Sequence, residues 1–288
     1  MNFISKSIYL LSVIFILASC TERIDIKTDD APEYLVIYGN ITTDKKQHAV
    51  KLTRSTGYFA TGKPGVLSNA RVSISTDDET FPMLEDPANP GVYLTDNVSG
   101  VEGKTYNLNV SLDFDGDGQP EEYNASSYLP YATRIDTIDL QPSTSFDDMI
   151  EVLVYGQLAD NEENFISVHV YKNDVLVNDS LVGFTVYDDE FIDNKTVTAL
   201  PCYFLSQTKE LSTVYPGDKV TLRIDALTKE YSKYLEDAQT EIFGSIPLFS
   251  GPPANVKGNI KKTDASNNVF VTGFFAAFSG NEKSTIVK

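Results

Sequence analysis

Residues 105–112 read Thr-Tyr-Asn-Leu-Asn-Val-Ser-Leu, with apolar side chains at alternate positions and polar side chains between them. This period of two is typical of a strand with one buried face and one face in water. The same pattern recurs, with turn residues between the runs, at residues 34–42, 48–53, 70–76, 91–95 and 123–129. Half-buried antiparallel strands at this spacing predict a mostly-β fold, with an immunoglobulin-like β-sandwich over residues 33–130.

The stretch from Pro130 to Pro142 predicts the passage into a second β-rich domain, residues 131–288. Further alternating runs indicate more strands in this part, and the apolar run 269–278 is typical of a central strand. One helix is predicted near residues 228–239. Thr228 is its expected N-cap, and Tyr231, Tyr234 and Leu235 lie on one face at helical spacing.

The N-terminus carries the signature of an exported lipoprotein. A lysine is followed by the apolar run Ile8–Ala18, which is too short to span a bilayer and is typical of a signal peptide over residues 1–19. Leu17-Ala18-Ser19-Cys20 matches a lipobox, in which Cys20 receives lipid (diacylglycerol and palmitate) after cleavage. The alternative is an ordinary signal peptide that happens to contain a cysteine. The turn-rich residues 20–32 are expected to form a lipidated tether.

Composition excludes some partners. Asp and Glu number 41 against 23 Lys and Arg, so the formal net charge is −18. Nucleic-acid binding requires a basic surface, which argues against a nucleic-acid partner. With Cys20 lipidated, Cys202 is the remaining thiol. Its apolar surroundings predict a buried, inert cysteine.

One short segment has the spacing of a metal loop. Asp113, Asp115 and Asp117 place carboxylates at alternate positions with Gly118 sixth, as in the start of a calcium-binding EF-hand loop. The twelfth position is Asn124 rather than the bidentate glutamate. The alternatives are a structural calcium site and a metal-free Asp/Gly hairpin turn.

The remaining polar residues do not form a recognisable catalytic motif. His48 and His169 lie in alternating runs and are expected to be solvated strand histidines, and the acidic group 188–193 is expected to be a solvated loop. No catalytic residue is therefore assigned. Tyr58 and Phe59 lie beside glycines in residues 55–65, which is typical both of a binding loop and of an ordinary hairpin end.

Several segments together resemble a known family. They are the lipobox, the run from Pro32 to Thr42, Gly91-Val-Tyr, residues 103–110, 186–193 and 230–235, and the closing Pro252–Ile260 with Gly273-Phe-Phe-Ala. In this order they resemble the Bacteroidota outer-membrane lipoproteins catalogued as domain of unknown function 4249. The resemblance implies a lipoprotein that is commonly encoded beside TonB-dependent transporters. It supplies no activity and no catalytic residues.

In organisms of that family, periplasmic O-glycosylation uses an Asp-Ser/Thr-apolar pattern. Asp136-Thr137-Ile138 and Asp179-Ser180-Leu181 match it, which makes Thr137 and Ser180 candidate glycosylation sites. The alternative is chance, since so loose a pattern recurs easily.

We expect a protein anchored through Cys20 to the outer membrane, facing the periplasm or the cell surface. The expected function is non-enzymatic: an accessory that binds a ligand or the transporter in TonB-dependent uptake, without a cofactor other than a structural calcium. The alternatives are a surface hydrolase acting on imported peptides or glycans, and an adhesive or structural surface protein. Acidic residues and histidine at a deep cleft would favour the hydrolase, an apolar patch a partner-binding module, and an exposed strand edge an adhesin.

Overall fold

The computed structural model describes residues 33–56, 62–160, 162–190, 192–243, 256–263 and 270–288. In this part of the chain most residues lie in strands, and a single α-helix is present. The strands are β1 (Tyr34–Thr42), β2 (Lys46–Arg54), β3 (Arg71–Ser75), β4 (Thr80–Glu85), β5 (Val92–Val98), β6 (Thr105–Leu112), β7 (Glu121–Tyr128), β8 (Arg134–Pro142), β9 (Met149–Gln157), β10 (Phe165–Lys172), β11 (Val175–Leu176), β12 (Thr185–Asp188), β13 (Thr196–Ser206), β14 (Lys219–Leu227), β15 (Lys261–Lys262) and β16 (Phe270–Ile286). The helices are α2 (Lys229–Phe243) and two 3₁₀ turns, η1 (Leu181–Gly183) and η2 (Asp193–Lys195). The predicted mostly-β fold with one helix is confirmed.

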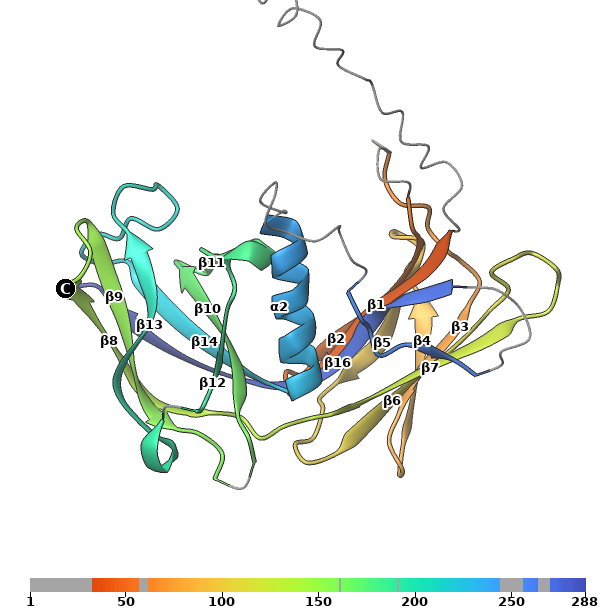
Figure 1. The fold of residues 1–288 in the computed structure, drawn as a ribbon, viewed down its shortest axis with the longest axis horizontal. Helices are drawn as coiled ribbons and strands as arrows, with labels where there is room; N and C mark the ends of the chain where they lie inside the picture. Colours follow the sequence, from red (N-terminus) through yellow and green to blue (C-terminus); the bar gives the residue numbers. More distant parts are fainter. Residues whose placement is uncertain (1–32, 57–61, 161, 191, 244–255, 264–269) are drawn as a thin grey trace, which may run out of the picture. The chain divides into compact units, whose positions relative to one another are not determined.

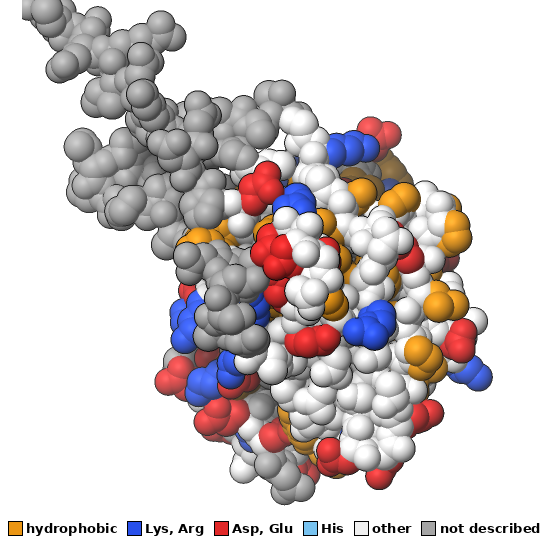
Figure 2. All heavy atoms as spheres, turned by 90° about the vertical axis from the view of Figure 1, so that its right-hand side faces the viewer, with side chains coloured by type: hydrophobic (Ala, Val, Ile, Leu, Met, Phe, Trp, Pro, Cys, Tyr) orange, Lys and Arg blue, Asp and Glu red, His pale blue; other side chains and the backbone are white. Residues whose placement is uncertain are grey.

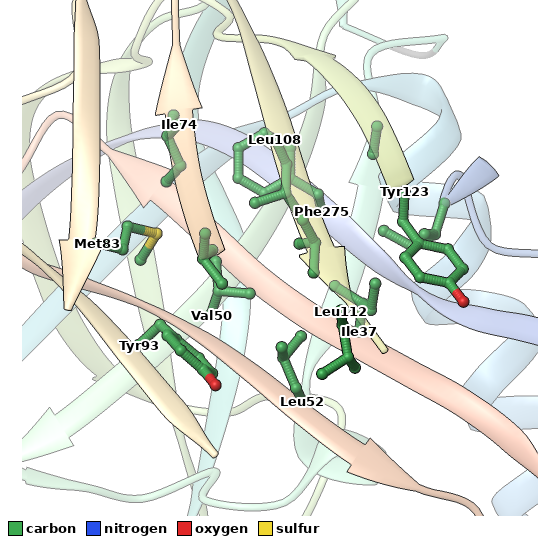
Figure 3. Close-up of a cluster of buried hydrophobic side chains, with 14 of the residues drawn as sticks. Ile37, Val50, Leu52, Ile74, Met83, Tyr93, Leu108, Leu112, Tyr123 and Phe275 are labelled. Carbon is green, nitrogen blue, oxygen red and sulfur yellow. The ribbon is translucent and has the colours of Figure 1, made fainter. Parts of the chain in front are cut away.

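The first half of the chain forms a sandwich-like pair of sheets. In one set β2 lies between β1 and β5 and pairs with both. In the other set the strands pair in the order β4, β3, β6, β7, and β4 joins the two sets by pairing with β5. The alternate apolar residues of both sets point into one shared cluster, where Ile74, Leu108 and Phe275 meet (Figure 3). The period-two pattern of the sequence therefore marks the inward face of each strand.

Strand β16 is central, as its apolar run predicts. Its first part, Phe270–Phe278, pairs in parallel with β1, and its second part, Ser279–Ile286, pairs antiparallel with β14. The parallel pair departs from the antiparallel arrangement that the sequence predicts for residues 33–130. Its residues are mostly buried, which is typical of parallel strands. Gly273, at φ +110°, permits the pairing, because a Cβ there would lie 1.9 Å from the carbonyl oxygen of Ile37.

A second pair of layers lies on the other part of β16. β13, β9 and β8 form a three-stranded sheet that faces β10, β14 and the end of β16 across a second apolar cluster (Figure 1). Because β16 pairs with strands of both halves, residues 33–56 and 62–288 form one compact unit. The division into domains after residue 130 stays a prediction.

Helix α2 begins where the sequence predicts and continues to Phe243. The hydroxyl oxygen of Thr228 accepts the backbone N–H of Tyr231 at 3.2 Å, as an N-cap does. Tyr231 and Leu235 pack on Phe274 of β16, which is why this helical face is apolar. The Tyr231 hydroxyl also lies 2.9 Å from that of Tyr38 on β1.

Candidate functional site

A groove of about 650 Å³ lies between the edge strand β8 and the end of β16. β8 is the outer strand of its sheet, and no described strand pairs with the side of it that faces β16. The lining residues are Thr137, Ile138, Asp139, Leu140, Gln141, Pro142, Ile150, Tyr155, Thr285, Ile286, Val287 and Lys288. Two strand edges therefore face each other across an open space.

The backbone of β8 presents hydrogen-bonding groups to this groove. The Ser143 N–H donates to the Met149 carbonyl at 2.8 Å, which places that pair in the ladder to β9. Since ladder bonds alternate, Gln141 and Asp139 also point their backbone groups at β9, whereas Leu140 and Pro142 point theirs at the groove. Proline has no N–H to donate. Because the backbone of Pro142 faces the groove and not β9, no hydrogen bond of the ladder is lost there.

The facing edge of β16 is arranged in the same way. The Val287 N–H donates to the Asp218 carbonyl at 2.9 Å, so Val287 faces β14. The alternation then turns the backbone groups of Ile286, Ser284 and Glu282 away from β14, toward β8.

Side chains already cap one N–H on each edge. The Leu140 N–H donates to Oδ1 of Asp139 at 2.9 Å, and the Glu282 N–H donates to Oδ1 of Asn281 at 2.9 Å. Short side chains that accept hydrogen bonds in this way satisfy the backbone N–H groups of an edge strand when no other strand pairs with it. Asn281 also donates from Nδ2 to the Thr133 carbonyl at 3.1 Å, which joins the two edges at the start of β8. The groove lies beyond this bond, along the stretches that reach Pro142 and Lys288.

The floor of the groove is the margin of the second apolar cluster. Ile138 is buried there, and Leu140, Ile150 and Val287 are partly buried against the same cluster. The groove therefore combines apolar side chains with two rows of backbone donors and acceptors.

The predicted metal loop does bring its three carboxylates together. Ligand oxygens of Asp113, Asp115 and Asp117 lie within 4.8 Å of one another in the β6–β7 connection. The same carboxylates also build the turn. Asp113 accepts the N–H groups of Gly116 and Gly118 at 2.8 and 3.0 Å, and both glycines have a positive φ.

The further ligands that a calcium loop requires are engaged elsewhere. Asn124, at the twelfth position, donates from Nδ2 to the Thr263 hydroxyl at 2.8 Å. Glu121 is turned inward, where it accepts the Phe114 N–H at 3.0 Å, and Arg54 lies over the Phe114 ring. The chemistry of the three carboxylates fits a cation, but the bidentate glutamate of an EF-hand has no counterpart among these contacts. The calcium site and the metal-free turn both stay open.

Neither histidine is solvated, so the expectation of solvated strand histidines is wrong: His48 is buried, and the side chain of His169 is only 12% exposed. His48 is 1% exposed, and its Nε2 lies 3.1 Å from the Val98 carbonyl. His169 packs edge-on against Phe184 at a centroid distance of 4.6 Å. Burial, reinforced by the Arg223 charge, lowers the pKa of His169 to about 4, so its ring is neutral at pH 7.

His169 belongs to a buried polar cluster that resembles a catalytic triad in composition only. Ser167 Oγ and Asp225 Oδ2 lie 3.1 and 3.4 Å from the same ring nitrogen, Nε2. A triad requires the acid on one ring nitrogen and the nucleophile on the other, so this arrangement cannot relay a proton between Ser167 and Asp225. Arg223 instead pairs with Asp225 at 2.7 Å and with Asp44 at 2.9 Å, which links β14 to the β1–β2 turn.

The other predicted residues are placed as follows. Cys202 is buried, as predicted, and burial raises the pKa of its thiol to about 12. Asp189 is not simply solvated, because it pairs with Lys195 and accepts the amide of Asn164 at 2.8 Å. Ser180 is exposed just before η1. Cys20, Tyr58 and Phe59 lie outside the described residues.

Thr137, the other candidate glycosylation site, is exposed on β8 and lines the groove. No sequence signal identified the groove itself, because it depends on which strand edges the fold leaves without a partner. The proline at position 142 was a local hint of an edge strand.

Two further observations concern parts of the molecule away from the groove. On the face that Figure 2 shows, apolar side chains are dispersed among polar and charged ones rather than gathered in one patch. Within the described part of the chain, no helix combines the length and the apolar character needed to cross a membrane.

Comparison with known proteins gives a family and no established function. No curated protein matches the chain. Among solved structures, the FN1–FN3 domains of chicken CNTN1 are 12% identical, with a TM-score of 0.26, over 67% of this chain and 60% of that one. A bacterial ice-binding adhesin is 11% identical, with a TM-score of 0.22, over 88% of this chain and 63% of that one. The chain thus spans less than two thirds of either structure. The model of one family matches residues 21–284, and the chain therefore belongs to the family described as domain of unknown function DUF4249.

Proposed function

We propose that the protein is a lipoprotein, anchored through Cys20 to the outer membrane, that acts as a non-enzymatic binding accessory in TonB-dependent uptake. The lipobox Leu17–Cys20 supports the anchor. The groove between β8 and β16 supports the binding role, and it is the observation on which the proposal depends.

The chemistry of the groove favours binding over hydrolysis. Among its lining residues Asp139 carries the one carboxylate side chain, and this carboxylate accepts the Leu140 N–H at 2.9 Å. A hydrolase of peptides or glycans needs an acid and a base that both reach the substrate. The described histidine with acidic neighbours, His169, is buried in a different cluster and does not line the groove.

One observation also favours the adhesive or structural alternative. A polymerising surface protein takes a strand from a second copy at an unpaired edge, and β8 has such an edge. The two functions differ in the occupant of the groove. An accessory binds a different membrane protein, and an adhesin binds itself.

The test is purification from the native host after mild crosslinking of intact cells. Wild-type protein should sediment with outer membranes and co-purify with a TonB-dependent transporter. Cys20→Ala should be released in soluble, folded form, because the lipid supplies about 0.8 kcal/mol of anchoring free energy per buried methylene. Crosslinks only between copies of this chain would favour the adhesin. A Cys20→Ala protein that still sediments after a salt wash would refute the anchor.

A matched pair of variants locates the binding surface. Tyr58→Ala and Phe59→Ala test the predicted aromatic loop, and an aromatic hot-spot residue typically costs 2 kcal/mol or more when truncated. If transporter recovery survives these substitutions and high salt, the partner surface lies elsewhere, and the groove is the next surface to alter.

A further inference from the structure

We infer that the groove between β8 and β16 binds an extended segment of a partner polypeptide, which adds as a strand between the two edges and alternates apolar with basic residues. The inference rests on the proposed binding function and specifies how the partner is recognised.

The backbone groups that face the groove indicate the kind of ligand. Leu140 on β8 and Ile286 on β16 both direct their peptide groups into the groove. A row of peptide donors and acceptors is matched by another extended peptide, because spacing along the two chains is the same. The stretch Thr137–Pro142 is about 20 Å long at about 3.3 Å per residue, so it accommodates a segment of about six residues.

The apolar floor of the groove favours apolar side chains at every second position of the added strand. A strand lying in the groove directs every second side chain inward, toward Ile138, Leu140 and Val287 at the margin of the apolar cluster. Apolar side chains at those positions would remove this margin from water. The positions between them point to the surface.

The charge of the protein favours basic residues at the outward-pointing positions of the added strand. Asp136 has Arg134 as its ion partner, but no cation pairs with Asp139 in the described part of the chain. A lysine or arginine of the incoming strand opposite Asp139 supplies that partner. A formal net charge of −18 attracts a basic segment and repels a second copy of this chain, which is why the inference names a different polypeptide.

Binding also exchanges one set of hydrogen bonds for another. In the free protein the Asp139 carboxylate caps the Leu140 N–H. When a basic side chain draws this carboxylate outward, the Leu140 N–H is free to donate to the carbonyl of the added strand. Asp139 thus protects the edge when the groove is empty and recognises the partner when it is filled.

The test uses the full-length protein in detergent and a synthetic peptide of about seven residues, with blocked ends, that alternates lysine and valine. Fluorescence anisotropy of the labelled peptide should show saturable binding. Two control peptides separate the contributions: one replaces lysine with glutamate, and one keeps the sequence but carries N-methyl groups on alternate backbone nitrogens. We expect neither control to bind, because the first loses the charge match and the second loses the backbone donors.

Two pairs of protein variants connect binding to the groove. Ile286 is exposed and pairs with Lys219 of β14, but its N–H points to the groove rather than to β14. Ile286→Pro therefore removes a donor of the groove, whereas Ile286→Val retains it. The proline variant should bind the peptide about three- to tenfold more weakly, the usual effect of one hydrogen bond. Asp139→Asn keeps the cap on Leu140 but removes the charge, and should weaken binding about two- to fivefold. The control Asp77→Asn alters an exposed aspartate in the β3–β4 connection.

The outcomes are distinguishable from those of the proposed function. Equal binding of the lysine peptide and its N-methylated form, or no effect of Ile286→Pro in a protein with an unchanged melting temperature, would overturn strand addition. Dimers or larger assemblies that disappear with Ile286→Pro would overturn the choice of a different polypeptide. If a transporter is recovered but the peptide does not bind, the accessory function is supported and recognition by strand addition is refuted.

Discussion

The Asn281 side chain donates to the carbonyl oxygen of Thr133 at 3.1 Å and accepts the N–H of Glu282 at 2.9 Å. The side-chain amide of Asn281 therefore joins β16 to Thr133, the residue before β8. Beyond this bond the two strands separate.

We predict that Asn281→Ala loosens this junction. Loss of the bond to Thr133 leaves a partly buried carbonyl without that donor, which typically costs about 1 kcal/mol of unfolding free energy. Urea denaturation should show a lower midpoint than for Asn97→Ala, which truncates an exposed asparagine of β5. Equal midpoints for the two variants would show that the Asn281 bond does not hold the strands together.

The aspartate loop gives a second prediction. Asp113→Ala removes the acceptor of two N–H groups and should lower the unfolding free energy by about 1 kcal/mol, both with chelator and with excess calcium. This is the result expected of a metal-free turn. Calcium at a hundredfold excess over its Kd would instead stabilise the wild type by about 2.7 kcal/mol. A calcium-dependent rise in melting temperature that Asp115→Ala abolishes would assign the loop to the metal.

A third prediction concerns pH. Because the folded-state pKa of His169 is about 4, against an ordinary value of 6.5, the unfolded chain binds the proton first as pH falls. The stability that this histidine contributes is present above pH 6.5 and is lost progressively down to about pH 4, by about 3 kcal/mol at most. His169→Gln should flatten the pH dependence of unfolding in this window.

The control for that experiment is His48→Gln, because burial lowers the pKa of His48 as well. Each variant should remove a separate part of the pH dependence. If His169→Gln unfolds with the wild-type pH profile, the pKa of His169 is the same in the folded and the unfolded state and is not lowered by burial.

A fourth prediction tests O-glycosylation at Thr137 and Ser180. Both side chains are exposed, so a transferase can reach them in the folded protein. Intact mass spectrometry of the protein from its native host should show an excess over the lipidated polypeptide, reduced in Thr137→Ala and again in Ser180→Ala. A wild-type mass equal to that of the lipidated polypeptide would reject both sites.

The sequence was a good guide wherever structure is local. The alternation in residues 105–112 marks the inward face of β6, and Thr228 marks the start of α2. It was a poor guide to pairing between distant segments. The parallel pair Tyr34–Phe270 joins residues more than two hundred positions apart, and no local pattern selects that partner.

The same limit explains the two histidines and the groove. The period of two puts Ser167, His169 and Tyr171 on one face of β10. It does not show that Phe184 packs against His169, or that Arg223 lies opposite it on β14. The groove likewise results from an edge that remains without a strand. Both features depend on tertiary contacts, which a single sequence does not display.

The parallel pair of β1 and β16 gives the protein a mechanical property. β1 begins directly after the segment that leads to Cys20, and β16 ends at the groove. In the proposed arrangement, in which Cys20 is anchored and a partner occupies the groove, a pull between the two acts on the N-terminal end of β1 and the C-terminal end of β16. The load is a shear along the whole ladder from Tyr34–Phe270 to Thr42–Phe278, so its hydrogen bonds must fail together rather than one after another. Forced unfolding in this direction should therefore be slower than forced unfolding that peels the same two strands apart from one end.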